Sequence, residues 1–431
     1  MALNIQANSI AIISDDLTGA NDTGLQFYLK GCNTQVIFDT ASLVDNKFSQ
    51  AFAISTETRT VDPHEAFQKV AMTTREIYKD FNVDNLYKKI DSTLRGNIAT
   101  EVLAVLDATD YEVAVILPAF PQEGRTTIGG YQLLKGIPIE RTEFARDPKN
   151  PIFESHIPTL LKSQIEDKNL VGLIEFTTVV KGAGPILSRL KQLISEGKRL
   201  IVADSISTTD IEQVALAIKK CNTSILPCGS AGLAQVLAEE WFPDLTYQHI
   251  SKKLPELPIL VVSGSATDIT KKQMLKLEED DDLDPYFIKI TPDKLLNELQ
   301  EDYSERIINN LGTHNTVVIQ ASPLDNKEVL SFLEERGLES DKIPSLMTDY
   351  LAKLTQKIVK EKEVILILVG GETAYKCCNL IGSKNLQIID EVEPAIPLCM
   401  DPNAQWIVTK SGNLGNPNTL INILRYFKQH V

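Results

Sequence analysis

The residues best suited to chemistry are densest in Lys88–Asn97, which reads Lys-Lys-Ile-Asp-Ser-Thr-Leu-Arg-Gly-Asn. Within one turn this segment offers the cations of Lys89 and Arg95, the carboxylate of Asp91, hydroxyl groups and a glycine. Lys and Arg hold anions, an Asp can accept a proton, and Gly allows close approach of the backbone. The segment therefore predicts a site for an anionic ligand, although a helix cap followed by a solvated Arg would explain it equally well.

A second polar cluster, Asp15 and Asp16, follows the apolar run Ile10–Ser14 and precedes a Leu-Thr-Gly sequence. One Asp at such a turn is often only a helix cap. Two in succession, close to glycine residues, indicate a binding or catalytic site as well. A third polar run, Thr56–Arg59, follows the apolar run Ala51–Ser55 and ends in a guanidinium group.

A fourth polar run follows the apolar segment Glu112–Leu117 and leads through two prolines to Arg125. The prolines exclude a helix and predict an extended loop. Arg125 comes directly after Gly124 and is placed to reach an anion, although a lone surface Arg is the commoner explanation. The next segment, 127–168, shows no clear period.

Short strands must carry these clusters, because each cluster directly follows an apolar run. Asp84–Ile90 predicts a strand before the Lys-Asp-Ser-Thr-Leu-Arg turn, and Ile98–Leu106 has the period of a helix after it. Strands and helices alternate in this way through 1–241, which predicts a mostly parallel sheet covered on both faces. Proteins of the α/β class place their ligand groups at such strand-to-helix turns.

The segment 242–258 breaks this rhythm with three prolines and mixed charge, and we interpret it as a linker. A second alternation of strands and helices fills 259–431. The predicted fold is therefore α/β, with two domains that are each a mostly parallel sheet flanked by helices. The length of 431 residues agrees with this, because it exceeds what one ordinary core accommodates.

Turns rich in Gly, Ser and Thr follow the predicted strands of the second half. A Gly-Gly pair lets the backbone approach a ligand, and the free N–H groups at a helix start bind phosphate. The turns at Gly370 and Lys410 are predicted to be one α/β unit apart, as in a nucleotide cleft. The chain lacks both the P-loop motif and the Gly-x-Gly-x-x-Gly fingerprint. The Gly370–Gly371 pair and the Thr373 hydroxyl are the residues of these turns best suited to phosphate.

The formal net charge of −15 disfavours nucleic acids and anionic membranes as partners, so an anionic substrate would need a local cluster of Lys and Arg. The apolar runs are far shorter than a bilayer span, and the N-terminus shows no leader pattern. Six Cys without Cys-x-x-Cys spacing fit a reducing compartment, and a cytoplasmic location is predicted. Five scattered His give no zinc motif, and a homo-oligomer remains an open alternative.

Taken together, these stretches resemble the four-carbon acid sugar kinase family, whose members phosphorylate D-threonate, D-erythronate or 3-oxo-tetronate at the terminal hydroxyl with ATP. Such an enzyme is a phosphotransferase with an alcohol group as acceptor. The motifs span both predicted domains. They are Ser-Asp-Asp-Leu-Thr-Gly-Ala-Asn-Asp-Thr-Gly (14–24), Thr-Glu-Thr-Arg (56–59), Lys-Lys-Ile-Asp-Ser-Thr-Leu-Arg-Gly-Asn (88–97), Pro-Ala-Phe-Pro-Gln-Glu-Gly-Arg-Thr (118–126), Gly-Ser-Ala-Gly-Leu-Ala (229–234), Val-Ser-Gly-Ser (262–265), Gly-Gly-Glu-Thr-Ala (370–374) and Thr-Lys-Ser-Gly-Asn-Leu-Gly (409–415).

The resemblance implies that 1–241 binds the sugar acid and that 259–431 binds ATP, with Mg²⁺ expected beside the nucleotide on ligands that the sequence does not identify. The expected ATP-binding residues are Ser265, Gly370, Gly371, Glu372, Thr373, Lys410, Ser411 and Gly412. We expect Arg59 and Lys89 to hold the substrate, Asp16 or Asp91 to accept the hydroxyl proton, and Lys410 to balance charge on the transferred group. The full set of expected substrate-binding residues is Asp15, Asp16, Arg59, Lys89, Ile90, Asp91, Ser92, Arg95 and Arg125.

Three departures from the family pattern lie on the nucleotide side. Ala395 replaces the Gly of a usual Glu-Pro-Gly, Met400-Asp401-Pro402 stands where a Gly is normal, and Leu414 stands where an aromatic is usual. Two alternatives to a kinase remain, and the departures favour the first of them. One is a non-catalytic ligand-binding regulator on a degenerate kinase fold, and the other is a hydroxy-acid lyase or dehydrogenase, which would not depend on ATP.

Overall fold

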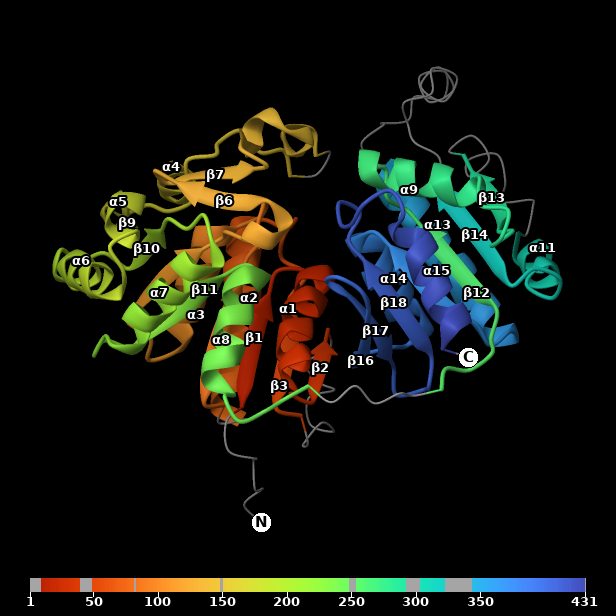
Figure 1. Cartoon of the computed structure of the whole chain (residues 1–431), viewed down its shortest axis with the longest axis horizontal. Helices are drawn as coiled ribbons and strands as arrows, with labels where there is room; N and C mark the ends of the chain where they lie inside the picture. Colours follow the sequence, from red (N-terminus) through yellow and green to blue (C-terminus); the bar gives the residue numbers. More distant parts are fainter. Residues whose placement is uncertain are drawn as a thin grey trace, which may run out of the picture. The chain divides into compact units, whose positions relative to one another are not determined.

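The computed structural model describes residues 9–38, 49–80, 83–147, 150–247, 253–291, 303–321 and 343–430. The chain divides into two compact units, Met1–Gln248 and His249–Val431, and the division falls within the segment interpreted as a linker. Each unit is a mostly parallel sheet with helices on both faces, so the predicted fold class is confirmed (Figure 1). Among the described helices, none combines the length and the apolar character needed to cross a bilayer.

The main sheet of the first unit is built of parallel strands that are apolar and largely buried. The predicted strand Ile10–Ser14 is confirmed, and all five of its residues are buried, as expected for a strand covered on both faces. Across the sheet the order is β2 (Thr34–Ile37), β3 (Ala51–Ser55), β1 (Ile10–Ser14), β4 (Asn85–Lys89), β11 (Ile225–Gly229), β5 (Val113–Leu117), β10 (Leu200–Ala203) and β9 (Val171–Ile174).

Helices cover both faces of this sheet because successive strand residues point in opposite directions. On one face, α2 (Pro63–Asp80) and α3 (Ile98–Ala108) pack with Ala11 and Ile13 into one hydrophobic core. The helices α1 (Leu17–Lys30), α8 (Ala231–Trp241), α7 (Thr208–Lys219) and α6 (Ala183–Ser195) form a second row, each packed against the next.

The chain order creates a crevice between the carboxyl ends of β1 and β4. From β1 the chain passes through α1 to β2 on one side, whereas from β4 it passes through α3 to β5 on the other. The two connections diverge, and ligands of open α/β sheets bind where this happens. The clusters Asp15–Asp16 and Lys88–Asn97 follow these two strands.

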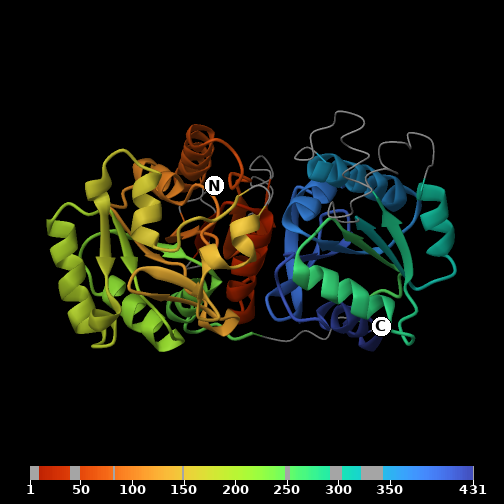
Figure 2. The same cartoon turned by 90° about the horizontal axis from the view of Figure 1, so that it is seen from above.

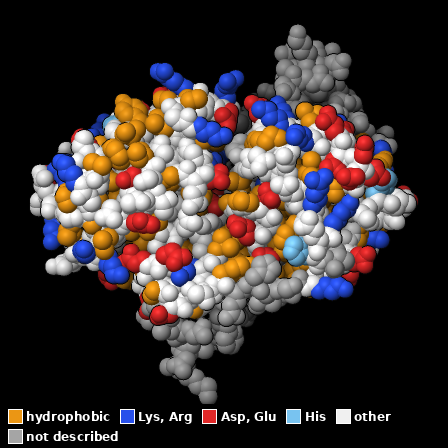
Figure 3. Space-filling view, in the orientation of Figure 1, with side chains coloured by type: hydrophobic (Ala, Val, Ile, Leu, Met, Phe, Trp, Pro, Cys, Tyr) orange, Lys and Arg blue, Asp and Glu red, His pale blue; other side chains and the backbone are white. Residues whose placement is uncertain are grey.

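The segment 127–168, which shows no clear period, contributes to a small antiparallel sheet of β6 (Arg125–Ile128), β7 (Tyr131–Leu134) and β8 (Ile137–Pro138). Apolar side chains gather over it, and Ile128, Tyr131 and Ile137 are 42%, 47% and 49% exposed (Figure 3). The buried carboxylate of Asp204 accepts the backbone N–H groups of Gly129 and Gly130 at 2.7 and 2.8 Å and so fixes the β6–β7 turn. The loop before β6 is not fully extended as predicted, because Pro121–Glu123 forms a 3₁₀ turn.

The second unit has the strand order β13 (Tyr286–Ile290), β14 (Thr316–Ala321), β12 (Ile259–Ser263), β15 (Ile365–Val369), β18 (Trp406–Lys410), β17 (Ile396–Met400) and β16 (Asn385–Glu393). Pairing is parallel from β13 to β18 and antiparallel for the last two strands. One face carries α9 (Asp268–Glu278) and α15 (Thr419–Gln429); the other carries α11 (Tyr303–Asn310), α13 (Ile343–Glu361) and α14 (Gly371–Ile381) (Figure 2).

The expectation that one α/β unit separates Gly370 from Lys410 is wrong. The chain runs through α14 and then through the β16–β17 hairpin before it reaches β18. The half-buried, partly polar pattern of Asn385–Glu393 hides this hairpin from a search for apolar runs. Even so, β15 and β18 are neighbours in the sheet, so their carboxyl ends lie side by side.

Candidate active site

Asp16 is both a helix cap and a member of a charged cluster. It is the N-cap of α1, with Oδ1 accepting the N–H of Gly19 at 2.8 Å and Oδ2 accepting the hydroxyl of Thr18 at 2.7 Å. The two explanations that the sequence left open for this residue therefore hold together, because the same carboxylate also pairs with Arg59.

Arg59 bridges the two adjacent aspartates. Its Nε and Nη2 lie 2.7 and 2.9 Å from the two oxygens of Asp15, and its Nη1 and Nη2 lie 2.6 and 2.7 Å from those of Asp16. Burial raises the pKa of Asp15, but the Arg59 guanidinium outweighs this and holds that pKa below its ordinary value. Gly96, with φ +91°, lets the backbone pass close to Arg59. Arg59 thus holds the Asp15 carboxylate ionised and keeps both carboxylates in place.

Asp91 is held by a second arginine. Arg95 Nε lies 2.6 Å from Asp91 Oδ2, which also accepts the hydroxyl of Thr93 at 2.5 Å. Burial raises the pKa of Asp91, but Arg95 and Arg59 more than offset this, and the pKa lies well below its usual range. The carboxylate oxygens of both candidate bases, Asp16 and Asp91, therefore already accept hydrogen bonds from an arginine and from nearby donors.

Two further predicted residues of this turn contribute through the backbone. The side chain of Ile90 is buried in the hydrophobic core, and its N–H donates to the carbonyl of Gly229 at 2.9 Å. The carbonyl of Ser92 accepts Gln132 Nε2 at 2.7 Å. These contacts tie the turn to β11 and to the small sheet.

Lys89 reaches the start of α1 from the end of β4. Its Nζ lies 2.9 Å from the position that a Cβ on Gly19 would take, and Ser14 Oγ and Asp16 Oδ1 lie within 2.8 Å of the same position. Only glycine at 19 leaves this space. The Lys89 side chain is 4% exposed, yet its ammonium group makes no hydrogen bond to any residue that the structure describes.

Arg125 also belongs to this part of the unit. Its Nη1 lies 3.3 Å from the carbonyl and 3.4 Å from Oε2 of Glu123, while its Nε is buried without a hydrogen-bond partner among the described residues. The field of Arg125 lowers the pKa of Asp22, which places these two side chains near each other.

Sequence reasoning missed two carboxylates of the site. Asp22 lies on α1 one turn after Gly19, and burial raises its pKa to about 6 against the opposing influence of Lys89 and Arg125. Glu57 has φ +49°, accepts the N–H of Leu17 at 2.8 Å, and has its pKa raised to about 7 by burial. The three-residue spacing from Gly19 to Asp22 was the available signal for the first, whereas nothing in the sequence distinguishes the second.

Three loops converge at the strand ends of the second unit. The hydroxyls of Thr267 and Thr270 both donate to the carbonyl of Gly412 at 2.8 Å, and Ser265 Oγ lies 3.2 Å from Thr267 Oγ1. A Cβ on Gly412 would collide with Ser265 Oγ. The loops after β12 and β18 are therefore in direct contact, and the sequence did not single out the two threonines that join them.

The loop after β15 completes this arrangement. Gly370, with φ +110°, is the N-cap of α14, and its N–H donates to the carbonyl of Lys410 at 2.8 Å. A Cβ on Gly264 would collide with Thr373 Oγ1. The structure thus brings the predicted residues Ser265, Gly370, Thr373 and Gly412 into one cluster at the start of a helix, a geometry suited to phosphate.

Two predicted nucleotide-binding residues are engaged within the protein. Glu372 Oε1 lies 3.0 Å from Lys376 Nζ, which also contacts Asp349 at 2.6 Å. Lys410 is buried, donates to the carbonyl of Ser411 at 2.9 Å, and has its pKa lowered to about 7 by burial.

The departures from the family pattern have local structural roles. Ala395 lies in the β16–β17 turn, and Asp401 Oδ1 accepts the N–H groups of Asn403 and Gln405, both at 2.8 Å, in the next turn. The side chain of Leu414 packs against the core of the unit. Each departure thus fits its own turn or the core.

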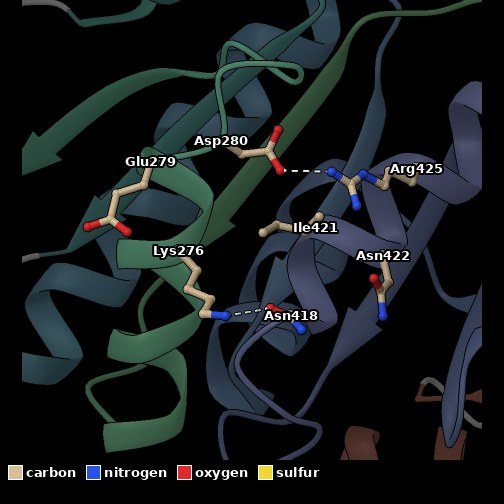
Figure 4. A pocket seen from close by; sticks show the side chains of 7 residues that line it. All are labelled: Lys276, Glu279, Asp280, Asn418, Ile421, Asn422 and Arg425. Atoms are coloured by element: carbon tan, nitrogen blue, oxygen red, sulfur yellow. Dashed lines mark hydrogen bonds and ion pairs between the residues drawn. The ribbon is translucent and has the colours of Figure 1, made fainter.

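A cleft of about 360 Å³ lies between α9 and α15 (Figure 4). Lys276 Nζ lies 3.0 Å from Asn418 Oδ1, and Arg425 Nη2 lies 3.1 Å from Asp280 Oδ2. Its lining, Lys276, Glu279, Asp280, Asn418, Ile421, Asn422 and Arg425, includes none of the predicted phosphate-binding residues.

Comparisons with known proteins agree with this two-part organisation. Residues 10–237 match the family model described as a sugar-binding N-terminal domain, and residues 260–420 match the nucleotide-binding C-terminal domain. The chain is 29% identical to a D-threonate kinase of Salmonella typhimurium, covering 97% of this chain and 98% of the relative. It is 30% identical to a D-erythronate kinase of Heliobacterium modesticaldum, covering 97% of both.

A relative with a third substrate name and a solved structure also match nearly the whole chain. A 3-oxo-tetronate kinase of Cupriavidus necator is 25% identical over 98% of both chains. A crystal structure from Salmonella typhimurium has the same fold with a TM-score of 0.80 at 23% identity, covering 97% of this chain and 99% of the other. The matched domains, in this order and over nearly the whole length, show that the chain belongs to the four-carbon acid sugar kinase family.

Proposed function

We propose that this protein transfers the γ-phosphoryl group of ATP to the terminal hydroxyl of a four-carbon sugar acid such as D-threonate, D-erythronate or 3-oxo-tetronate. The observation that carries the proposal is Lys89, which is 4% exposed and whose ammonium group has no hydrogen bond from the described residues, at the crevice between β1 and β4. A buried cation without such a partner requires an anion. The carboxylate of a sugar acid supplies one, and the names of the relatives point to the same ligand class.

In this proposal the charged turns of the first unit divide the work. Lys89 and Arg125 bind the carboxylate and hydroxyl oxygens of the substrate. Arg59 orients Asp15 and Asp16, since its donors are already directed to them. The backbone of Ile90–Ser92 and the Asp91–Arg95 pair shape the remaining wall.

The second unit binds ATP through the cluster at the start of α14. The N–H groups of Gly370–Thr373 and the helix dipole favour the β- and γ-phosphates, while Ser265 and Gly412 hold the neighbouring loops. Lys410 and Ser411 line the adjacent strand end, and Lys410 takes up a proton when phosphate charge arrives because its pKa lies near 7. Glu372 contributes through its ion pair with Lys376.

Magnesium is proposed to enter with the nucleotide. Within the described residues, no group of three or more His, Cys, Asp or Glu side chains is arranged to hold a metal ion. Mg²⁺ in kinases takes much of its coordination from phosphates and water, with few protein carboxylates, so this arrangement fits an ion carried by ATP. When bound, the ion would neutralise charge on the phosphates.

The proposal is tested by incubating the purified protein with ATP–Mg²⁺ and each four-carbon acid, and by following ADP release in a coupled assay. We expect turnover with at least one of D-threonate, D-erythronate and 3-oxo-tetronate. Turnover without ATP would indicate a lyase or dehydrogenase. Tight binding of an acid without ADP release would indicate the regulator instead.

A pair of calorimetric titrations then tests the division between the units. Gly371→Val should abolish ATP binding, because a side chain at the start of α14 would occupy the proposed phosphate position, and it should leave binding of the acid intact. Arg59→Ala should weaken binding of the acid and leave binding of ATP unaffected. A variant that loses both ligands equally would contradict the assignment of its residue to one ligand.

A further inference from the structure

Two buried polar atoms from two elements of the first unit lack hydrogen-bond partners among the described residues: Oδ1 of Asp22 on α1 and Nε of Arg125 on β6. Lys89 on β4, which is 4% exposed, acts electrostatically on the same Asp22 carboxylate. Buried polar groups are nearly always paired, so each exception needs an explanation. Two such atoms beside the Lys89 ammonium group indicate a ligand that the crevice is built to receive.

The three side chains lie near one another. Lys89 Nζ lies beside Gly19, and Asp22 follows on the same face of α1, since residues three apart are neighbours on a helix. Both Lys89 and Arg125 act electrostatically on the Asp22 carboxylate. The other charged groups that face it are Glu123, from the turn before β6, and Asp16, from the start of α1.

The missing partners define the ligand. Lys89 and Arg125 offer donors, and Asp22 offers an acceptor. A hydroxy acid is complementary, because its carboxylate and hydroxyl oxygens accept from the two cations while one hydroxyl hydrogen is donated to Asp22. Asp16 and Asp91 offer no such vacancy, because their oxygens accept from Arg59 and Arg95.

We infer that Asp22, rather than Asp16 or Asp91, is the general base that accepts the proton of the substrate hydroxyl. This inference rests on the proposed kinase function. The hydroxyl O–H bond breaks and its proton passes to the Asp22 carboxylate, while the oxygen forms a bond to the γ-phosphorus of ATP. The bond from that phosphorus to the β–γ bridging oxygen breaks, and its electron pair leaves with ADP.

The environment of Asp22 suits this role. Burial raises its pKa to about 6, and Lys89 and Arg125 limit the rise. A base is most effective when its pKa lies close to the working pH, whereas a strongly acidic carboxylate such as Asp91 binds a proton weakly. Turnover should therefore fall as the pH drops below about 6, where Asp22 becomes protonated.

The test compares Asp22→Asn with Asp16→Asn and Asp91→Asn, and uses Asp107→Asn as a control for the loss of one negative charge. Asp107 lies at the far end of α3 and is half exposed. We expect Asp22→Asn to lower kcat by roughly 10²–10⁴ with little change in the KM of the acid, and to abolish the acid limb of the pH profile near 6. Asp22→Glu should keep that limb, and circular dichroism checks the fold of each variant.

The outcomes separate the inference from the proposed function. If the parental protein phosphorylates an acid and Asp22→Asn turns over at the parental rate with the parental pH profile, Asp22 is not the base, although the kinase function stands. If the parental protein shows no phosphoryl transfer, calorimetry of D-threonate binding between pH 5 and 8 decides. If the pH dependence of binding disappears in Asp22→Asn, Asp22 belongs to the ligand site. If the dependence is unchanged, Asp22 does not contact the ligand and the inference is wrong.

Discussion

Lys88 Nζ lies 2.8 Å from Oε2 of Glu101, and the two side chains are 0% and 2% exposed. Lys88 and Lys89 are consecutive residues of β4, so their side chains leave opposite faces of the sheet. Lys88 is buried against the Glu101 carboxylate of α3. Lys89 reaches the crevice beside α1, where its ammonium group has no hydrogen bond from the described residues. Lys88 also contributes to the low pKa of Asp15, so the buried Lys88–Glu101 pair influences the charge of the site from the opposite face of the sheet.

Removing one member of this pair should be costly. Glu101→Ala leaves Lys88 buried and uncompensated, which costs about 3–5 kcal/mol in proteins. The combined change Lys88→Met and Glu101→Leu should recover most of the loss, since both charges are removed together. Urea unfolding of the three proteins measures this, and equal stability of the single and double variants would contradict it.

Ala395 occupies a conformation that favours glycine. Its φ is +62°, and its N–H donates to Glu391 Oε1 at 2.9 Å. A non-glycine residue pays roughly 1–2 kcal/mol in the left-handed region, so Ala395→Gly should stabilise the protein by about 1 kcal/mol. Ala352→Gly, inside α13, is the matched control and should destabilise by a similar amount. Thermal unfolding that shifts the same way for both would rule out the explanation.

Lys410 should make stability depend on pH. Burial lowers its pKa to about 7 from an ordinary value of 10.5, so between these values the unfolded chain holds a proton that the folded chain does not. Stability therefore rises with pH across this window, by up to about 1.4 kcal/mol for each unit. Denaturation at several pH values should show a shallower rise for Lys410→Met than for the parent. Parallel curves would place the ammonium group in a wetter site.

Replacing Gly412 should weaken the use of ATP and leave the use of the sugar acid unchanged. A Cβ there would collide with Ser265 Oγ and lie 3.2 Å from the methyl group of Thr267, so Gly412→Ala must separate two of the three loops. The KM for ATP should rise at least about tenfold, which corresponds to roughly 1.4 kcal/mol. Gly184→Ala makes the same chemical change where no atom lies within 4 Å, and it should behave as the parent. A KM for ATP that stays unchanged in Gly412→Ala would remove these loops from the nucleotide site.

Local sequence patterns were sufficient to predict many of the strands and helices. Ile10–Ser14 and Ala51–Ser55 are the predicted strands, because buried parallel strands are continuous apolar runs. The helix after Asn97 was also predicted at its first residue, Ile98. The placement of charged clusters at strand ends followed from the same reasoning, since the residues after an apolar run lie at the sheet edge.

Long-range pairing was not visible in the same way. Nothing near Arg59 in the sequence shows that its donors go to Asp15 and Asp16, more than forty residues away. The small sheet of β6–β8 was missed because its strands are at most four residues long and are separated by glycine turns. The importance of Asp22 depends on partners from β4 and β6, which only the tertiary structure brings to it.

The position of β11 has a consequence for how the chain is made. This strand, Ile225–Gly229, inserts between β4 and β5, which precede it by more than a hundred residues. A nascent chain therefore cannot complete the sheet beside Lys89 until nearly all of the first unit has left the ribosome. Before that moment the edge of β4 remains open, and an open strand edge is a site for aggregation. Synthesis that stalls before Ile225 should accordingly yield chains that depend on chaperones.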